Sequence, residues 1–251
     1  MAVDRLRLAS YNIHIGVGRD GHFHPERVAA VLRELDADVI ALQEVQLGAG
    51  TFDMLAHLAE ATGYAGLAGP TLTHPVHGHY GNAVLSRLPV VGSRCLDLSV
   101  PGHEPRGALD ATIACGHGTS VRLIATHLGL RPPERRQQVR HLLREVAADV
   151  HRGPSVLLGD LNEWFLWGRP LRWLHGHFGR PPAPRTFPAG WPLLALDRVW
   201  VKPRDCLQAI AVHQTPLARL ASDHLPVVAA LDLARCRVPP AVAVQAAPLE
   251  A

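Results

Sequence analysis

The sequence is poor in several features that mark specialised proteins. Only one of its 25 basic residues is a lysine, Lys202, and aromatic residues make up 5% of the 251-residue chain. No apolar run approaches the roughly 20 residues that cross a bilayer, and the N-terminal residues show no signal-peptide core. We therefore expect a soluble, cytoplasmic protein. Peripheral contact with a membrane surface is left open by these absences.

Cysteine is scarce and scattered. The four cysteines form no CxxC pair, which excludes a zinc knuckle or a redox dithiol of that type. We expect free thiols in a reducing compartment. The chain also lacks an HExxH motif, which disfavours a zinc-dependent hydrolase. The cysteines are Cys95, Cys115, Cys206 and Cys236.

The composition that is present is that of a folded globular protein. Hydrophobic residues make up 47% of the chain and charged residues 19%, which excludes a disordered protein. We expect one domain over residues 1–236 and a flexible Pro/Ala-rich tail over residues 237–251. A net charge of +3 suits an anionic substrate but is too small to identify a nucleic-acid binder. We expect a monomer.

One pattern occurs twice: a strand ending in a polar residue, a helix, and a second strand followed by an acid. The first copy supplies Asn12 and Glu44, which lie 32 positions apart (44 − 12), and the second supplies His127 and Asp160, which lie 33 apart (160 − 127). This match predicts a structural duplication. The alternative is that two ordinary strand–helix–strand units agree by chance.

Several further segments predict short strands with few helices between them. Residues 82–86, 108–113, 194–201 and 209–212 have this character. Helices are expected over residues 52–62, with Thr51 as the N-cap, and from Glu134, with a solvated arginine face. The predicted fold is α/β: a four-layer α/β sandwich in which two mixed or mostly antiparallel sheets pack together, flanked by helices.

Polar side chains stand at the ends of these predicted strands, where a rigid scaffold presents them to a cleft. Carboxylates such as Glu44 are preferred ligands of magnesium and manganese. A histidine beside a carboxylate can deprotonate water. Neutral amides such as those of Asn12 and Asn162 donate hydrogen bonds to phosphate without adding negative charge, which makes Asn12 a candidate substrate contact as well. In chain order these residues are Asn12, Glu44, His127, Asp160, Asn162, Asp197, Asp223 and His224.

Seven motifs, taken in order over residues 6–233, resemble those of the endonuclease/exonuclease/phosphatase (DNase I-like) superfamily, and within it a compact bacterial subgroup. Each motif alone is weak, and their common order makes the resemblance specific. They are Ala9-Ser10-Tyr11-Asn12, Leu42-Gln43-Glu44-Val45, Tyr80-Gly81-Asn82-Ala83-Val84-Leu85-Ser86, Ala125-Thr126-His127-Leu128, Gly159-Asp160-Leu161-Asn162, Leu196-Asp197-Arg198-Val199 and Ser222-Asp223-His224-Leu225-Pro226.

The resemblance implies a metal site and a base. Glu44 is then the main ligand of Mg²⁺, or alternatively Mn²⁺, with Asn12 beside it and Asp223 as a second-site or water-bridged ligand. His224 is the general base that activates water, and Asp197 orients it. The implied reaction is in-line attack of water on a phosphoester, without a covalent enzyme intermediate.

The resemblance also implies substrate-binding roles. Asp160 and Asn162 position the nucleophile and the phosphate, and His127 binds the phosphate or protonates the leaving group. Arg106 is a candidate phosphate contact because a guanidinium suits bidentate recognition, with a plain surface arginine as the alternative. Asn82 is either a substrate contact or a turn residue that supports the site.

The substrate is less defined than the chemistry. Residues 163–174 interleave Trp, Phe and Arg, a composition that suits a membrane interface, stacking on nucleic-acid bases, or a local core. A further set of motifs resembles the compact bacterial subgroup, which is often linked with phospholipid metabolism: Arg185-Thr186-Phe187-Pro188, Trp191-Pro192-Leu193-Leu194-Ala195-Leu196-Asp197 and Asn162-Glu163-Trp164. The single lysine disfavours the inositol-phosphate phosphatases of this fold.

We therefore predict a magnesium-dependent phosphodiesterase. A phospholipid or small phosphodiester stands ahead of nucleic acid as its substrate. The alternatives are a DNA or RNA endo- or exonuclease and, more distantly, a catalytically silent binding module of the same fold.

Overall fold

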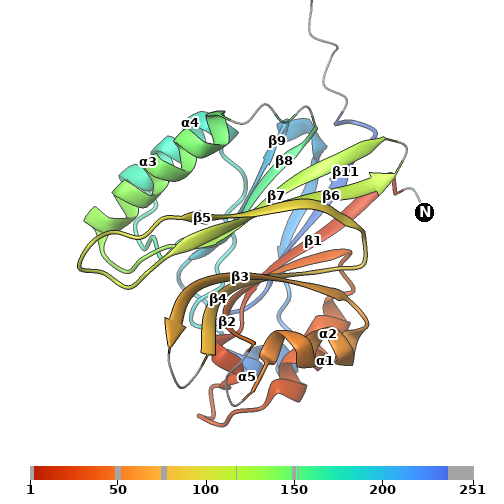
Figure 1. Ribbon diagram of the computed structural model, residues 1–251, viewed down its shortest axis with the longest axis vertical. Helices are drawn as coiled ribbons and strands as arrows, with labels where there is room; N and C mark the ends of the chain where they lie inside the picture. The colour runs from red at the N-terminus through yellow and green to blue at the C-terminus, as the bar shows by residue number, and fades with distance from the viewer. Residues whose placement is uncertain are drawn as a thin grey trace, which may run out of the picture.

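Two β-sheets stack face to face, and helices cover the outer face of each (Figure 1). The structure, a computed structural model, describes residues 3–48, 52–74, 78–116, 118–148, 151 and 153–236. The six-stranded sheet has the order β10-β11-β1-β2-β4-β3, and the five-stranded sheet has the order β5-β6-β7-β8-β9. This arrangement confirms the predicted four-layer α/β sandwich.

The element bounds follow the chain closely. The strands are β1 (Arg5–Asn12), β2 (Val39–Leu47), β3 (Ala65–His74), β4 (Gly78–Ser86), β5 (Val90–Asp97), β6 (Gly107–Gly116), β7 (Thr119–His127), β8 (Ser155–Asp160), β9 (Asp197–Lys202), β10 (Leu207–Val212) and β11 (Val227–Asp232). The helices are α1 (Pro25–Leu35), α2 (Met54–Thr62), α3 (Pro132–Ala148), α4 (Arg169–Phe178) and α5 (Pro216–Ala221), with short 3-10 turns η1 (His14–Gly16) and η2 (Arg204–Cys206).

Three apolar clusters hold the four layers together. Strand alternation sends Leu8 of β1 into the cluster between the sheets and Ala9 into the cluster under α1, α2 and α5. A third cluster joins α3 and α4 to the outer face of the five-stranded sheet, where Trp200 is fully buried. The central strands are therefore covered on both faces, which gives a rigid base for side chains at their ends.

The predicted duplication is visible in the sheets. β1 and β2 pair in parallel through α1, and β7 and β8 pair in parallel through α3. Every other pairing among the described strands is antiparallel. A right-handed crossover helix is the usual way to join parallel neighbours, so each unit places two strand ends at one edge of its sheet.

Two local predictions about helices need correction. The second helix begins at Met54, and the Asp53 side chain caps it by accepting a hydrogen bond from Ala56 N (3.0 Å); Thr51 lies outside the described residues. The arginine face predicted after Glu134 is not wholly solvated, because the Arg135 side chain is only 2% exposed. The cause is a buried partner, Glu163, which the local sequence pattern does not reveal.

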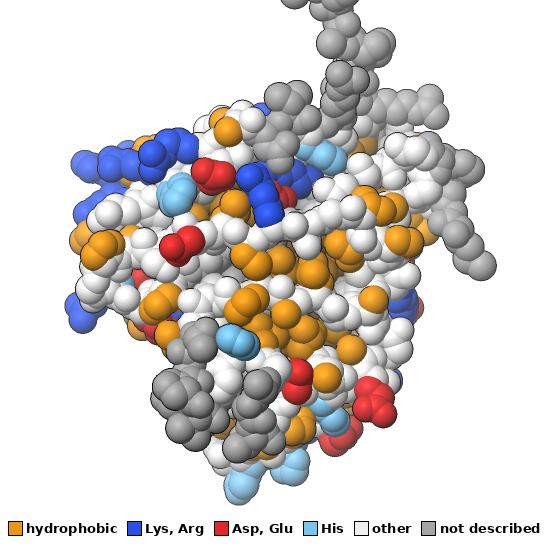
Figure 2. Space-filling view, in the orientation of Figure 1, with side chains coloured by type: hydrophobic (Ala, Val, Ile, Leu, Met, Phe, Trp, Pro, Cys, Tyr) orange, Lys and Arg blue, Asp and Glu red, His pale blue; other side chains and the backbone are white. Residues whose placement is uncertain are grey.

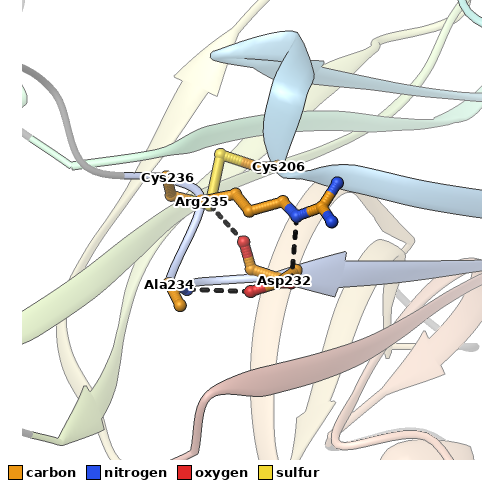
Figure 3. Close-up of a disulfide and its surroundings, with 5 residues drawn as sticks. All are labelled: Cys206, Asp232, Ala234, Arg235 and Cys236. Atoms are coloured by element: carbon orange, nitrogen blue, oxygen red, sulfur yellow. Dashed lines mark hydrogen bonds and ion pairs between the residues drawn. A yellow bond between two sulfur atoms is a disulfide. The ribbon is translucent and has the colours of Figure 1, made fainter.

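The prediction of free thiols is wrong for one pair of cysteines. Cys206, in η2, is bonded to Cys236, just after β11, with their Cα atoms 4.9 Å apart (Figure 3). The two residues are 30 positions apart in sequence, so proximity arises only from the fold. Cys95 and Cys115 are free. The predicted tail, residues 237–251, lies outside the described residues, and no described helix is long and apolar enough to cross a membrane.

Candidate functional site

Asp160 stands at the end of β8 and is 1% exposed. Gly159 before it has φ +143°, and a Cβ there would lie 1.8 Å from Thr126 O on the neighbouring strand β7. Only glycine fits such a close backbone approach. This tight pairing sets Asp160 directly opposite His127 in the parallel register.

His127 and Asn162 join the same group. Asn162 N donates to Asp160 Oδ1 (2.8 Å), and Asn162 Nδ2 donates to Leu128 O (3.0 Å). The carbonyl fixes the orientation of this amide, because only its nitrogen can donate. Asn162 Nδ2 also lies 3.0 Å from His127 Nε2, which must then accept and carry no proton. Asn162 holds this geometry at φ +50°, an uncommon value that recurs at functional sites.

His224, the predicted general base, lies beside Asp197, the carboxylate predicted to orient it. His224 Nδ1 lies 2.9 Å from Asp197 Oδ2, and both side chains are buried. Thr186 Oγ1 donates to the same Asp197 oxygen (2.6 Å). His224 Nε2 is left facing Asp160 Oδ2 at 3.6 Å. The carboxylate therefore fixes the ring orientation and places the proton on Nδ1, which leaves Nε2 free to accept one.

Asn12 links the two halves of the molecule. Its Nδ2 donates to Glu44 Oε1 (2.9 Å) and to Asp160 Oδ2 (3.1 Å), while its Oδ1 accepts from His14 N (3.0 Å). The backbone donor identifies Oδ1 and engages it. Asn12 therefore orients two carboxylates, and this geometry does not offer its oxygen as a metal ligand.

Glu44 reaches the site through an irregularity in β2. The pairing of β2 with β4 shifts between Leu42 and Val45, and Glu44 has φ +60°. A bulge of this kind re-aims a side chain that regular alternation would send elsewhere. The residue in register with Asn12 is Gln43, not Glu44, so the bulge brings the acid into the pocket.

Most of these residues line one pocket of about 380 Å³, whereas Asn12 and Asp197 lie behind its wall and do not line it. Four carboxylates face it, those of Glu44, Glu104, Asp160 and Asp223, against a single arginine, Arg106. A phosphate dianion or diester anion would be repelled by such a surface. The donor set fits a hard cation, because carboxylate oxygens are its usual ligands and its charge would offset the repulsion.

A second grouping, Asp160, Asp197 and His224, has ligand atoms within 4.8 Å of one another. Asp197 Oδ2 is engaged by Thr186 and His224, whereas its Oδ1 is buried without a hydrogen-bond partner among the described residues. The first oxygen thus belongs to the hydrogen-bonded base, and the second is a free acceptor.

The pKa values of His127 and His224 are shifted in opposite directions. Burial lowers the pKa of His127 to about 4, although Asp160 acts in the other direction. Burial also opposes protonation of His224, but the charges of Asp197 and Asp160 outweigh it and raise its pKa to about 10. His127 is therefore neutral at pH 7, in agreement with the acceptor role of its Nε2.

Of the three predicted substrate contacts, Asn12 has its amide engaged by Glu44, Asp160 and His14, and the other two differ in placement. Arg106 lines the pocket, is 6% exposed, and pairs with Glu104 through both terminal nitrogens (3.0 and 3.2 Å). Its Nε is buried and has no hydrogen-bond partner within the described part of the chain. Asn82 is not on the pocket wall: its Nδ2 donates to Gly107 O (3.1 Å) and ties β4 to the start of β6. This placement is that of a supporting residue.

Sequence reasoning missed several residues around the base. Thr186 supports Asp197, and Ser222 Oγ donates to Asn12 O (2.8 Å) while accepting from His224 N (3.2 Å). The Phe187 ring lies 4.8 Å from the His224 ring. Tyr80 also lines the pocket, and its pKa is raised by burial and by Glu44. All four of these residues stand within motifs quoted from the sequence, which was the available signal.

The chain is similar over most of its length to one known protein family. Residues 9–224 match the model of the Endonuclease/Exonuclease/phosphatase family. The chain is 33% identical to the uncharacterized protein YbhP of Escherichia coli K12 over 249 residues, which is 91% of this chain and 96% of that protein.

Solved structures share the fold. A crystal structure of an endonuclease/exonuclease/phosphatase from Beutenbergia cavernae is 29% identical, with a TM-score of 0.76, covering 92% of this chain and 72% of that one. A mannosyl-6-phosphatase from Bacteroides thetaiotaomicron is 19% identical, with a TM-score of 0.70 over 89% and 98% of the two chains, and shows the fold alone. With most of its length matched by the family model and a full-length relative above 30% identity, the chain belongs to the endonuclease/exonuclease/phosphatase family.

Proposed function

We propose that the protein is a divalent-metal-dependent phosphodiesterase that attacks its substrate with water activated by His224 and Asp197. One observation carries the proposal: Asp160 Oδ2 lies 3.6 Å from the Nε2 atoms of both His127 and His224 and 3.1 Å from Asn12 Nδ2. One carboxylate oxygen therefore lies close to Asn12, His127 and His224, which come from segments far apart in sequence. The intact constellation also argues against a catalytically silent binding module.

His224 acts as the general base that activates water. Its Nε2 accepts the proton of water while the imidazolium that forms is stabilised by Asp197, 2.9 Å from Nδ1. Asp160, facing Nε2 at 3.6 Å, holds the water for attack. Although burial opposes it, the charges of Asp197 and Asp160 raise the pKa of His224, and a cation in the pocket would lower it.

Phosphate binding is assigned to Arg106 and His127, which also line the pocket. Arg106 presents its guanidinium to the pocket, and its buried Nε has no partner among the described residues. Neutral His127 adds no charge there, and its Nε2 is held by Asn162. We therefore assign His127 to positioning Asn162 and the phosphate rather than to donating a proton from Nε2.

The cation is Mg²⁺, with Mn²⁺ as the alternative, held by Glu44 and Asp223 and supported by Asn12. When bound, it supplies charge that stabilises the developing negative charge on the phosphoryl oxygens. Asn12 orients Glu44 for this role through its 2.9 Å hydrogen bond.

For the substrate, we favour a phospholipid or small phosphodiester over nucleic acid. The pocket of about 380 Å³ has apolar as well as charged walls, contributed by Leu130, Trp164, Phe187 and Leu196. Such walls suit a diester with an apolar arm. A nuclease is the alternative, favoured by the arginines near α3 and α4.

The cysteines provide a test of the compartment. The missing signal-peptide core and the expected free thiols predict the cytoplasm, whereas a Cys206–Cys236 bond is typical of oxidising compartments. Alkylation of free thiols followed by mass spectrometry, on protein taken directly from cells, tests this: modification of both cysteines supports the cytoplasm, and their protection opposes it.

A panel of substrates tests the function. Bis(p-nitrophenyl) phosphate, phospholipids, plasmid DNA, abasic DNA and RNA are each incubated with Mg²⁺ and with EDTA. We expect metal-dependent hydrolysis of the soluble diester that Glu44→Ala and His224→Ala abolish without loss of fold. The controls Glu60→Ala and His22→Ala change exposed residues and should retain activity. Unchanged rates in either site variant would refute the assignment.

A further inference from the structure

Four consecutive apolar side chains project into solvent directly after the catalytic motif. Trp164, Phe165, Leu166 and Trp167 are 56%, 52%, 64% and 72% exposed. Trp164 also lines the catalytic pocket. Because they are exposed, these four side chains do not form a local core, which was one of the predictions for this segment. A contiguous apolar patch of this kind at a pocket mouth marks an interaction surface.

A second exposed apolar turn borders the same pocket. Trp191 is 75% exposed and Leu193 is 54% exposed, in a turn closed by the bridge between Phe187 and Leu194. Phe187 at the base of this turn lines the pocket together with Trp164. Both apolar segments therefore begin at the wall of the catalytic site.

Unpaired arginines lie beside the aromatic segment. A second cavity, of about 540 Å³, is lined by Phe165 and Trp167 and by the arginines Arg136, Arg169 and Arg172. None of the three guanidinium groups has a hydrogen bond or ion pair with a described residue. Figure 2 shows Lys and Arg side chains gathered over α3 and α4. The cavity thus offers positive charge to an anionic group from outside the protein.

The aromatic segment is held by a buried ion pair. Arg135 Nε and Nη2 lie 3.3 and 3.4 Å from the Glu163 carboxylate, and Arg135 Nη1 donates to Leu130 O (2.6 Å). Glu163 also accepts from Phe165 N (3.2 Å). The exposed rings therefore project from an anchored base, which reduces the ordering entropy lost on binding.

We propose that residues 164–167, the turn at residues 191–193 and the arginine cavity together form a docking face for an anionic phospholipid bilayer. Docking would bring the mouth of the catalytic pocket to the headgroup layer. This inference rests on the proposed phosphodiesterase function for its purpose, but the binding itself does not require it. Tryptophan rings settle at headgroup level, and arginines attract anionic lipid phosphates.

Lipid explains the whole face better than nucleic acid does. Aromatic rings and arginines suit both ligands. The exposed aliphatic side chains Leu166 and Leu193, however, offer no ring for base stacking, whereas they can enter the boundary of the acyl chains.

Vesicle co-sedimentation tests the proposal with the full chain. The probes are phosphatidylcholine vesicles with and without phosphatidylglycerol. We expect binding only with the anionic lipid, a loss of at least about tenfold in Phe165→Ser/Trp167→Ser, and a similar loss in Arg169→Glu/Arg172→Glu. Matched controls are Val91→Ser, an exposed apolar side chain elsewhere, and Arg5→Glu/Arg204→Glu, which reverses two exposed charges elsewhere.

Two further readouts separate this proposal from the proposed function. Neither docking variant should change hydrolysis of bis(p-nitrophenyl) phosphate, whereas an inactive wild type that still binds vesicles would overturn only the enzymatic assignment. Vesicle binding that is absent, insensitive to lipid charge, or equally reduced in the control variants would overturn the docking face. Tight binding of single-stranded DNA, lost in the same variants while vesicles are not bound, would assign the face to nucleic acid instead.

Discussion

The two strand–helix–strand units reach the same pocket by different backbone geometry. In the second unit, β7–α3–β8, His127 and Asp160 are paired directly in register, and both are buried. In the first unit, β1–α1–β2, the partner of Asn12 is Gln43, and a bulge brings Glu44 into the pocket. Under the proposed function, the regular unit positions water and phosphate with rigid, buried side chains, and the irregular unit aims a more accessible carboxylate at a cation.

Loss of the buried acid should have the largest effect. Asp160→Asn removes the charge that faces both histidines, so we expect hydrolysis to fall about a thousandfold or more, with no recovery at high Mg²⁺. Steady-state kinetics on a soluble diester over a range of Mg²⁺ concentrations measure this. Recovery by metal would mean that Asp160 is chiefly a ligand.

The corresponding change in the first unit should behave differently. Glu44→Gln removes the main candidate ligand, and we expect a loss of about 100-fold or more that added Mg²⁺ or Mn²⁺ partly restores. The matched control is Glu60→Gln, on the exposed surface of α2. If both units showed the same metal response, the division of roles between them would be wrong.

The two units should also differ in how tightly their strands pack, which a substitution in β8 can test through the stability of the fold. Gly159 in β8 cannot carry a Cβ without overlap with Thr126 O, whereas the corresponding position in β2 holds Leu42. We expect Gly159→Ala to lower the free energy of unfolding by about 3 kcal/mol, since overpacking and an unfavourable backbone conformation both contribute. Urea denaturation followed by circular dichroism measures this, and a change within the error of wild type would contradict the close approach.

The pH dependence of stability should show the opposite behaviour of the two histidines. The pKa of His127 is lowered to about 4, below its unfolded value of about 6.5, so the unfolded chain binds a proton first as the pH falls. Stability is then lost between pH 6.5 and 4. His224, with its pKa raised to about 10, contributes stability that is full below pH 6.5 and lost as the pH rises through 10.

His127→Gln isolates this smaller effect. Glutamine can still accept from Asn162 but does not titrate, so the stability of wild type relative to the variant should fall by about 2 kcal/mol between pH 7 and pH 5. Urea titrations in EDTA at both pH values supply the measurement. A constant difference would show that His127 titrates normally.

Much of the fold was predictable because its signals are local. Short apolar strands precede Asn12, Glu44, His127 and Asp160. The similar spacing of the two residues in each pair predicted the two parallel strand pairs. The helix at residues 169–178 was not predicted, because interleaved Trp and Arg residues also suit a membrane interface or a base-stacking segment.

The remaining features depend on tertiary contacts. Nothing local to Thr186 indicates that its hydroxyl supports Asp197, and nothing near Arg135 indicates a buried partner 28 positions away. The bulge that selects Glu44 over Gln43 arises in the pairing of β2 with β4. Likewise, only the fold brings Cys206 beside Cys236.

The central claim is metal-dependent attack of water on phosphorus, and one measurement tests it most directly. A soluble phosphodiester is hydrolysed in H₂¹⁸O with Mg²⁺, and the products are analysed by mass spectrometry. The account predicts one ¹⁸O in the phosphate monoester, none in the released alcohol, and no product in EDTA or from His224→Ala. Label in the alcohol, or equal product formation by His224→Ala, would contradict it.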